Sequence, residues 1–211
     1  MESGTIPESR IDQSVRRILR MKHRLGDPYV PVPVVGTPDH LRTMADIARQ
    51  SITVLLDRAL PLRPAQQVLV TGWGVRTTTN LTNALTERGL TATRLYTGLP
   101  GAEVIARAVA AAKAADVTVV TSYNAWGDGT QQSLVAALLA TGKPIVVVSV
   151  GGPYDIAYFP GVTTYLAAYS YQPVSVIAVA DVLAGRARAT GRLPVTIRTP
   201  DGATVLFRYG T

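Results

Sequence analysis

Two loops of this chain carry side chains that can recognise a carbohydrate. After the apolar run 117–122, Trp126 offers a ring that can stack on a sugar, and Asn124 and Asp128 can hydrogen-bond to hydroxyl groups. After the next apolar run, Asp155 follows two glycines and a proline. These four residues are candidates for the edge of a sugar substrate. Asp128 equally suits the start of the following helix, and the loop around Asp155 has the composition of a sharp turn.

A glycine-rich turn suggests a second kind of chemistry, the binding of a nucleotide. Gly72 and Gly74 match the first two glycines of the dinucleotide-binding fingerprint, but Thr77 stands at the position of the third. The strand that follows ends in Leu95-Tyr96-Thr97-Gly98, without an acidic residue to hold a ribose. A tight turn between a strand and a helix also needs glycine for backbone reasons alone. A nucleotide-binding α/β domain is therefore an alternative to a carbohydrate-related function.

Other catalytic and metal-binding chemistries lack the residues they need. The absence of cysteine excludes disulfides, thiolate metal sites and cysteine nucleophiles. His23 and His40 fall on different predicted helices, so no metal site is expected. No G-x-S-x-G motif occurs, and the sparse, scattered acidic residues supply no convincing pair for acid–base chemistry. We therefore predict no catalytic residue and no cofactor in this chain.

Composition indicates one globular domain with a small appendage. Of the 211 residues, 47% are hydrophobic and 17% are charged, which argues against a disordered or coiled-coil chain. The net charge of +7 permits attraction to nucleic acid. However, the basic residues are mostly dispersed and lack interleaved aromatic residues, so no nucleic-acid partner is expected. No apolar run is long enough to span a bilayer, and no signal-peptide pattern begins the chain, so a signal for export of a larger parent would lie upstream.

The first quarter of the sequence predicts two helices joined by a proline-rich linker. In the helix 10–26, apolar residues recur at helical spacing and form a stripe that is predicted to contact another domain. The candidate contact residues are Ile11, Val15, Ile18 and Leu25. Its many arginines and Lys22 form a solvated or domain-contacting face. After the linker, Thr37 and Pro38 suit the start of a second helix, which we expect to run to about Asp57.

Beyond residue 67 the pattern changes to short apolar runs that alternate with helical stretches. The expected strands are Val68–Thr71, Ala92–Tyr96, Val117–Ser122, Ile145–Val150 and Thr164–Ala168. The expected helices are Thr78–Arg88, Ala102–Ala114, Gln131–Thr141 and Pro173–Ala184. Leu193–Ile197 and Thr204–Tyr209 predict two more strands around a Pro-Asp-Gly turn. The fold class is therefore a three-layer α/β sandwich with a mostly parallel five- or six-stranded sheet, to which this last pair would add an antiparallel edge.

Several segments, in order along the chain, together resemble one family. The opening Arg10-Ile-Asp-Gln-Ser-Val-Arg-Arg-Ile-Leu19 resembles the segment that closes the catalytic barrel of family 3 glycoside hydrolases. Four further segments resemble successive sequence segments of the C-terminal domain of that family. They are Ala48–Asp57 with the following Leu-Pro-Leu, Gly142–Val148, Gly151–Asp155 and Gly191–Ile197. The Pro-Tyr-Asp form and the short loop after the third strand are more similar to the bacterial β-N-acetylhexosaminidase branch than to the β-glucosidase branch.

The resemblance implies an accessory domain whose catalytic partner is an N-terminal barrel in the same or a separate chain. In the β-N-acetylhexosaminidase branch the barrel supplies both catalytic groups, and neither the K-H-F-P-G nor the S-D-x-x-M motif occurs here. The chain alone is then inactive, and its parent acts on glycans that contain N-acetylglucosamine. The organisation predicted is a barrel-end helix (1–26), a linker and helix (27–66) and the sandwich (67–211), with self-association through the exposed stripe. A free-standing carbohydrate-binding or scaffold module is a further alternative.

Overall fold

The computed structural model describes residues 6–26, 31–98 and 100–211, and these form two units, 1–41 and 42–211. In the first unit, helix α1 (Glu8–Leu25) ends where Gly26 takes a positive φ of 64°. A single 3-10 turn, η1 (Val32–Val34), follows in the linker region. Residues 27–30, the start of the proline-rich linker that the sequence predicts, lie outside the described residues.

Helix α2 (Pro38–Ser51) begins as the sequence predicts but ends earlier. Thr37 Oγ1 accepts a hydrogen bond from the backbone N–H of His40 at 3.5 Å, so Thr37 lies at the start of the helix. The prediction that this helix runs to about Asp57 is wrong, because Thr53–Leu56 forms strand β1. Thr53 and Val54 are β-branched residues, which favour a strand. The sheet thus begins inside the stretch 27–66 that the sequence assigned to a linker and helix.

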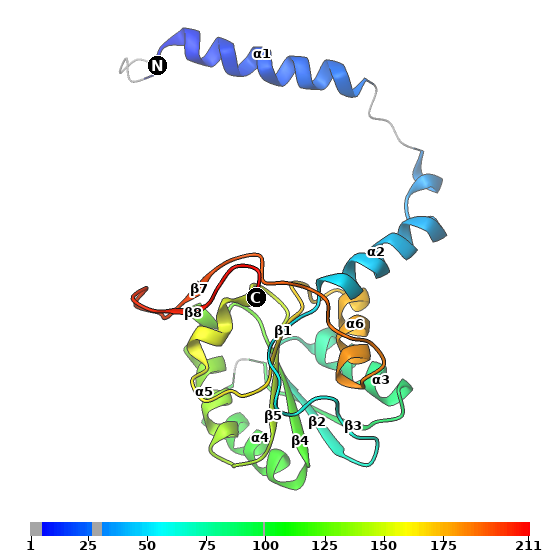
Figure 1. Cartoon of the computed structure of the whole chain (residues 1–211), viewed down its shortest axis with the longest axis vertical. Helices are drawn as coiled ribbons and strands as arrows, with labels where there is room; N and C mark the ends of the chain where they lie inside the picture. The colour runs from blue at the N-terminus through cyan, green and yellow to red at the C-terminus, as the bar shows by residue number, and fades with distance from the viewer. Residues whose placement is uncertain (1–5, 27–30, 99) are drawn as a thin grey trace. The chain divides into compact units, whose positions relative to one another are not determined.

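Six strands form one mostly parallel sheet in the second unit (Figure 1). The strands after β1 are β2 (Gln67–Gly72), β3 (Thr91–Tyr96), β4 (Val117–Ser122), β5 (Ile145–Ser149) and β6 (Tyr165–Ala167). The order across the sheet is β1-β6-β5-β4-β2-β3, and only the pairing of β1 with β6 is antiparallel. The sheet therefore has an antiparallel edge strand, but this strand is β1, which the sequence did not predict.

Helices cover both faces of the sheet, which makes the three layers of the predicted α/β sandwich (Figure 1). Helices α3 (Val75–Glu87) and α6 (Pro173–Leu183) pack on one face, and α4 (Ala102–Ala114) and α5 (Gly129–Leu139) pack on the other. Along β2, Val68 and Val70 belong to the first core and Leu69 to the second, as the alternation of side chains in a strand requires. Every residue of the central strands β4 and β5 is therefore buried.

Strand β3 and the C-terminal segment differ from the sequence expectations. Because β3 is the outer strand, its residues are exposed or only partly buried, and Thr91, Thr93 and Arg94 face solvent. The predicted C-terminal pair shrinks to β7 (Ile197–Arg198) and β8 (Val205–Phe207). These two strands form a separate antiparallel sheet and do not extend the main one, so the prediction that they form its edge is wrong.

The C-terminal segment is joined to the segment that leads into β1. The backbone N–H of Gly191 donates to the carbonyl oxygen of Ile52 at 3.0 Å, and the N–H of Leu193 donates to the carbonyl oxygen of Thr211 at 2.8 Å. The approach at Gly191 is so close that a Cβ atom there would lie 2.2 Å from the carbonyl oxygen of Ser51. A side chain at position 191 would therefore separate the two segments.

Candidate functional site

The candidate site lies at the carboxyl edge of the sheet, where ligands bind in open parallel sheets. Because β2, β4, β5 and β6 run in the same direction, the loops that follow them emerge at this one edge (Figure 1). The loop after β4 contains the 3-10 turn η2 (Ala125–Gly127), and the loop after β5 contains the 3-10 turn η3 (Pro153–Tyr158). All four predicted sugar-edge residues are in these two loops.

Three aromatic rings meet above the ends of β2, β4 and β6. Trp73 and Tyr123 stack with their ring centroids 4.4 Å apart, and Tyr171 approaches the two rings at 5.6 and 5.9 Å. Such offset and edge-on arrangements stabilise aromatic clusters beyond the area that they bury. Trp73, the residue between Gly72 and Gly74, is therefore part of an aromatic cluster.

Asn124 and Trp126 line two different hollows, although only Ala125 separates them. Asn124 has a left-handed backbone, with φ of 51°, and lines a hollow of about 510 Å³ together with Tyr123, Gly151 and Tyr169. A short polar side chain tolerates this conformation better than most others. Trp126 is 55% exposed. It lines a separate hollow of about 430 Å³, so the two residues do not share one binding surface.

The hollow beside Trp126 has the composition of a carbohydrate-binding surface. Tyr154 and Tyr158 come from η3, and Arg198 and Thr199 come from the end of β7 and the turn after it. Aromatic rings with hydroxyl groups and a guanidinium beside them suit a ligand with apolar faces and polar edges. The sequence indicated Trp126 but missed these neighbours, because their proximity depends on how the C-terminal segment packs against η3.

Asp128 begins helix α5 and lines neither hollow. Its Oδ1 accepts hydrogen bonds from the backbone N–H of Thr130 at 2.9 Å and from the Thr130 hydroxyl at 2.6 Å, and its Oδ2 accepts from Gln131 Nε2 at 3.0 Å. Burial raises the pKa of this carboxyl, but the hydrogen bonds from Thr130 and Gln131 outweigh burial and lower it. Asp128 is therefore ionised and committed to the helix, which is the alternative that its position suggested.

Asp155, the fourth predicted substrate-edge residue, is completely buried, so its carboxylate lies beneath the surface of these loops. Its Oδ1 accepts from the backbone N–H of Ala125 at 2.8 Å, and its Oδ2 accepts from Ser122 Oγ at 2.8 Å and lies 3.3 Å from Ser149 Oγ. Burial raises the pKa of the carboxyl, and these hydrogen bonds offset that effect only in part. Asp155 thus ties the loops after β4 and β5 together from inside.

The glycines that suggested a nucleotide site have backbone explanations. A Cβ at Gly72 would lie 2.2 Å from the carbonyl oxygen of Thr121, and a Cβ at Gly74 would lie 2.7 Å from Thr77 Oγ1. Both glycines also have positive φ, 105° and 84°. The turn needs glycine to pair β2 with β4 and to start α3, whether or not a ligand is present. Across the described ranges, no three potential metal-ligating side chains gather, and none of the described helices is long and apolar enough to cross a membrane.

The predicted interdomain stripe is on α1, a helix without a buried residue. Val15, Ile18 and Leu25 are 45%, 48% and 68% exposed, and Ile11 is partly buried. Ile11, Val15 and Ile18 line a shallow hollow along the helix, while Leu25 lies beyond it. The apolar surface that the sequence predicted is therefore present, and its role in contacting another domain stays a prediction.

Comparisons with known proteins agree on one family. A family model described as the glycosyl hydrolase family 3 C-terminal domain matches residues 52–209. A lysosomal beta glucosidase of Dictyostelium discoideum is 29% identical over an alignment that covers 92% of this chain. This chain spans only 31% of the length of that protein.

Solved structures have the same fold. A family 3 β-N-acetylglucosaminidase from Paenibacillus sp. str. FPU-7 superposes with a TM-score of 0.74 at 30% identity and covers 92% of this chain, which spans 40% of that enzyme. A β-glucosidase from Listeria innocua, solved in complex with glucose, has a TM-score of 0.72 at 17% identity; all of this chain and 39% of that one are covered. The second likeness shows the fold alone. This chain belongs to the glycosyl hydrolase family 3 C-terminal domain family.

Proposed function

We propose that this chain is the accessory domain of a bacterial retaining β-N-acetylhexosaminidase and has no hydrolytic activity alone. The proposal rests on the two aspartates in the loops at the carboxyl edge of the sheet. Within the described part of the loops after β4 and β5, Asp128 caps α5 and Asp155 is buried beneath the loops. A glycosidase needs two carboxyl groups positioned about 5 to 10 Å apart at the glycosidic bond. Neither aspartate is free for that chemistry.

The proposed partner is a catalytic barrel, and the proposed substrate is a glycan that contains N-acetylglucosamine. Support comes from the likeness to the Paenibacillus β-N-acetylglucosaminidase, of which this chain spans 40%. The remaining length of that enzyme is where a catalytic domain would lie. In this proposal the exposed stripe on α1, formed by Ile11, Val15, Ile18 and Leu25, contacts the barrel. In the isolated chain the same stripe would promote self-association.

Hydrolysis tests the proposal directly. The pure chain is expected to release no 4-nitrophenol from 4-nitrophenyl N-acetyl-β-glucosaminide above the rate of a buffer blank. The Asp128→Asn variant serves as the control, since Asp128 is the partly exposed carboxylate of the candidate loops. Release that exceeds the blank and disappears in Asp128→Asn would contradict an inactive domain. Release that is equal in both proteins would indicate a contaminating enzyme, to be removed by further purification before the assay is repeated.

We further propose that Trp126, with Tyr154 and Tyr158, forms an aromatic surface at the edge of the substrate cleft. Calorimetric titration with N-acetylglucosamine oligomers is expected to show weak binding that Trp126→Ala reduces about fivefold, because one stacking contact contributes about 1 kcal/mol. Tyr96→Ala is the matched control, since Tyr96 is an aromatic residue with 43% exposure outside this hollow. No binding by the unmodified chain, or equal losses in both variants, would contradict the proposed surface.

A further inference from the structure

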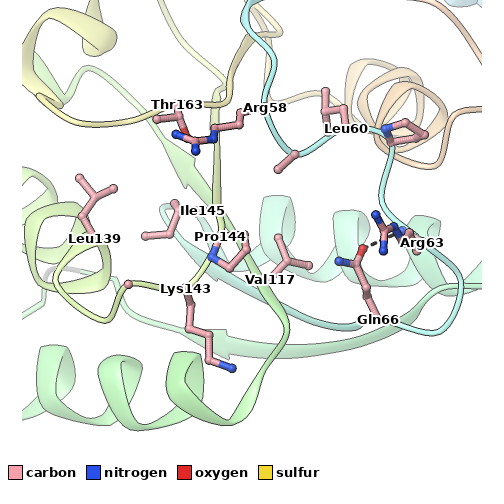
Figure 2. A pocket seen from close by; sticks show the side chains of 13 residues that line it. Arg58, Leu60, Arg63, Gln66, Val117, Leu139, Lys143, Pro144, Ile145 and Thr163 are labelled. Carbon is pink, nitrogen blue, oxygen red and sulfur yellow. Dashed lines mark hydrogen bonds between the residues drawn. The ribbon is translucent and has the colours of Figure 1, made fainter.

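A pocket of about 590 Å³ lies at the opposite, amino edge of the sheet (Figure 2). The connection after β1 supplies Arg58, Leu60 and Arg63, and the turn before β5 supplies Lys143 and Pro144. Val117 and Ile145, the first residues of β4 and β5, lie at its base. The pocket is therefore on the far side of the sheet from the loops that carry Trp126, and it belongs to no surface described above.

Three cationic side chains surround this pocket, and no acidic side chain lines it. Figure 2 shows the side chains of Arg58, Arg63 and Lys143 well apart from one another, with that of Lys143 extending away from the two arginines. Among the residues that the structure describes, none forms an ion pair with any of the three. An anion that enters the pocket therefore meets positive side chains and no negative one among the lining residues.

Short hydrogen-bonded turns fix the main chain beneath each cation. The buried Thr164 Oγ1 accepts from the backbone N–H groups of Arg58 and Ala59, at 3.2 and 3.1 Å. Gln66 Oε1 accepts from the N–H of Arg63 at 2.7 Å, and the N–H of Gln66 returns a bond to the Arg63 carbonyl oxygen at 3.0 Å. The main chain at Arg58 and Arg63 is therefore fixed before a ligand binds, so that binding orders the side chains of the two arginines and not their backbone.

Hydrogen bonds also hold the main chain at Lys143 and beside the two nearest acidic residues. Thr141 Oγ1 accepts from the N–H of Lys143 at 3.3 Å. Asp57 accepts from the N–H of Leu60 at 3.2 Å, and Asp116 accepts from the N–H of Gln67 at 2.8 Å. Both carboxylates hold neighbouring turns and stay out of the pocket lining. The side chains that line the pocket therefore include three positive charges and no negative charge.

We propose that this pocket binds a small anionic ligand that carries two or more phosphate groups. Three separated charges match a ligand whose anionic groups are spaced apart better than they match one compact ion. Guanidinium groups suit phosphate oxygens because they donate two parallel hydrogen bonds, and an ammonium group adds a point charge. The same chemistry occurs in inorganic oligophosphates and in nucleoside triphosphates. This site is independent of the proposed glycan function.

Calorimetric titration of the full chain with tripolyphosphate, and separately with ATP, tests the proposal. Both probes are expected to bind at low salt and to bind more weakly at 300 mM salt, because partly exposed charges are screened. Arg58→Gln and Arg63→Gln are each expected to lower the association constant about fivefold, whereas Lys143→Arg keeps its charge and should retain the affinity. Tighter binding of tripolyphosphate than of ATP would identify the phosphate chain alone as the ligand, and tighter binding of ATP would add the base and ribose.

Arg76→Gln is the matched control, since it removes one exposed positive charge from the other edge of the sheet. Arg76 is in the first turn of α3, directly after the glycine-rich turn. It is expected to change the association constant less than twofold. An equal loss in Arg76→Gln would overturn the proposal in favour of non-specific attraction or of binding at Gly72 and Gly74. The absence of binding by the unmodified chain at low salt would also overturn it. Each variant is first shown to keep the melting temperature of the parent.

Discussion

Gly72→Ala is expected to lower the free energy of unfolding by more than about 4 kcal/mol, enough to abolish cooperative folding in a protein of ordinary stability. Two costs combine at this residue. Its φ of 105° disfavours any side chain, and a Cβ would lie 2.2 Å from the carbonyl oxygen and 2.8 Å from the nitrogen of Thr121. Because that neighbour is the main chain of β4, no side-chain movement relieves the overlap. The central strands β2 and β4 would have to separate.

Two control substitutions separate these costs in urea denaturation. Gly142 has a φ of 72° with no atom within 4 Å of its Cβ position, so Gly142→Ala measures the conformational cost alone, about 1 kcal/mol. Gly101 is the N-cap of α4 with an extended backbone and open space, so Gly101→Ala meets no overlap and should cost about 0.5 to 1 kcal/mol, the ordinary loss when alanine replaces glycine at an N-cap. If Gly72→Ala is no worse than Gly142→Ala, then close approach to Thr121 does not constrain this turn.

Asp155→Ala is expected to destabilise the chain by about 3 kcal/mol or more, because it leaves the N–H of Ala125 and the hydroxyl of Ser122 without their acceptor in a buried site. Asp155→Asn should lose much less. Its oxygen can still accept from Ala125, and its amide can donate to Ser149 Oγ, which already lies 2.6 Å from the carbonyl oxygen of Gly152. Thermal or chemical denaturation of the two variants measures the difference. Equal losses would show that charge, and not hydrogen bonding, is what this site requires.

The difference in stability between the unmodified chain and Asp155→Asn is expected to depend on pH. Burial raises the pKa of Asp155 in the folded state above its ordinary value of 3.8, so the folded chain takes up this proton at a higher pH than the unfolded chain does. The protonated form therefore adds stability at low pH, and that contribution is lost as the pH rises through the folded pKa. The unmodified chain should gain stability relative to Asp155→Asn when the pH falls from 7 to 4. A constant difference over this range would contradict a raised pKa.

The layered fold could be predicted because its signals are local. A central parallel strand such as β4 at Val117–Ser122 is a short run rich in valine and threonine, and α4 begins and ends at its predicted residues. Strand β1 was missed because Thr53–Leu56 follows α2 directly, without a glycine or proline to mark the change. Its strand state depends on antiparallel pairing with β6, more than a hundred residues later, and no local pattern reveals that pairing.

The candidate site was harder to predict than the fold, because burial and neighbours decide what a polar residue does. Asp128 and Asp155 look alike in the sequence, yet one caps a helix in partial contact with water and the other is completely buried. Trp126 was identifiable from its type and its place after β4. The amino-edge pocket was not, since Arg58, Arg63 and Lys143 are ordinary surface residues until the fold places two distant turns side by side.

The hydrogen bonds that join Gly191 to Ile52 and Leu193 to Thr211 have a mechanical consequence. They place the first strand and the last residue of the sheet-bearing unit at one corner of the fold. A tension applied between these two points is expected to load these backbone hydrogen bonds and the antiparallel pairing of β1 with β6 before it loads the central strands β2, β4 and β5. A neighbour tethered at either point would therefore strain this corner of the sheet first.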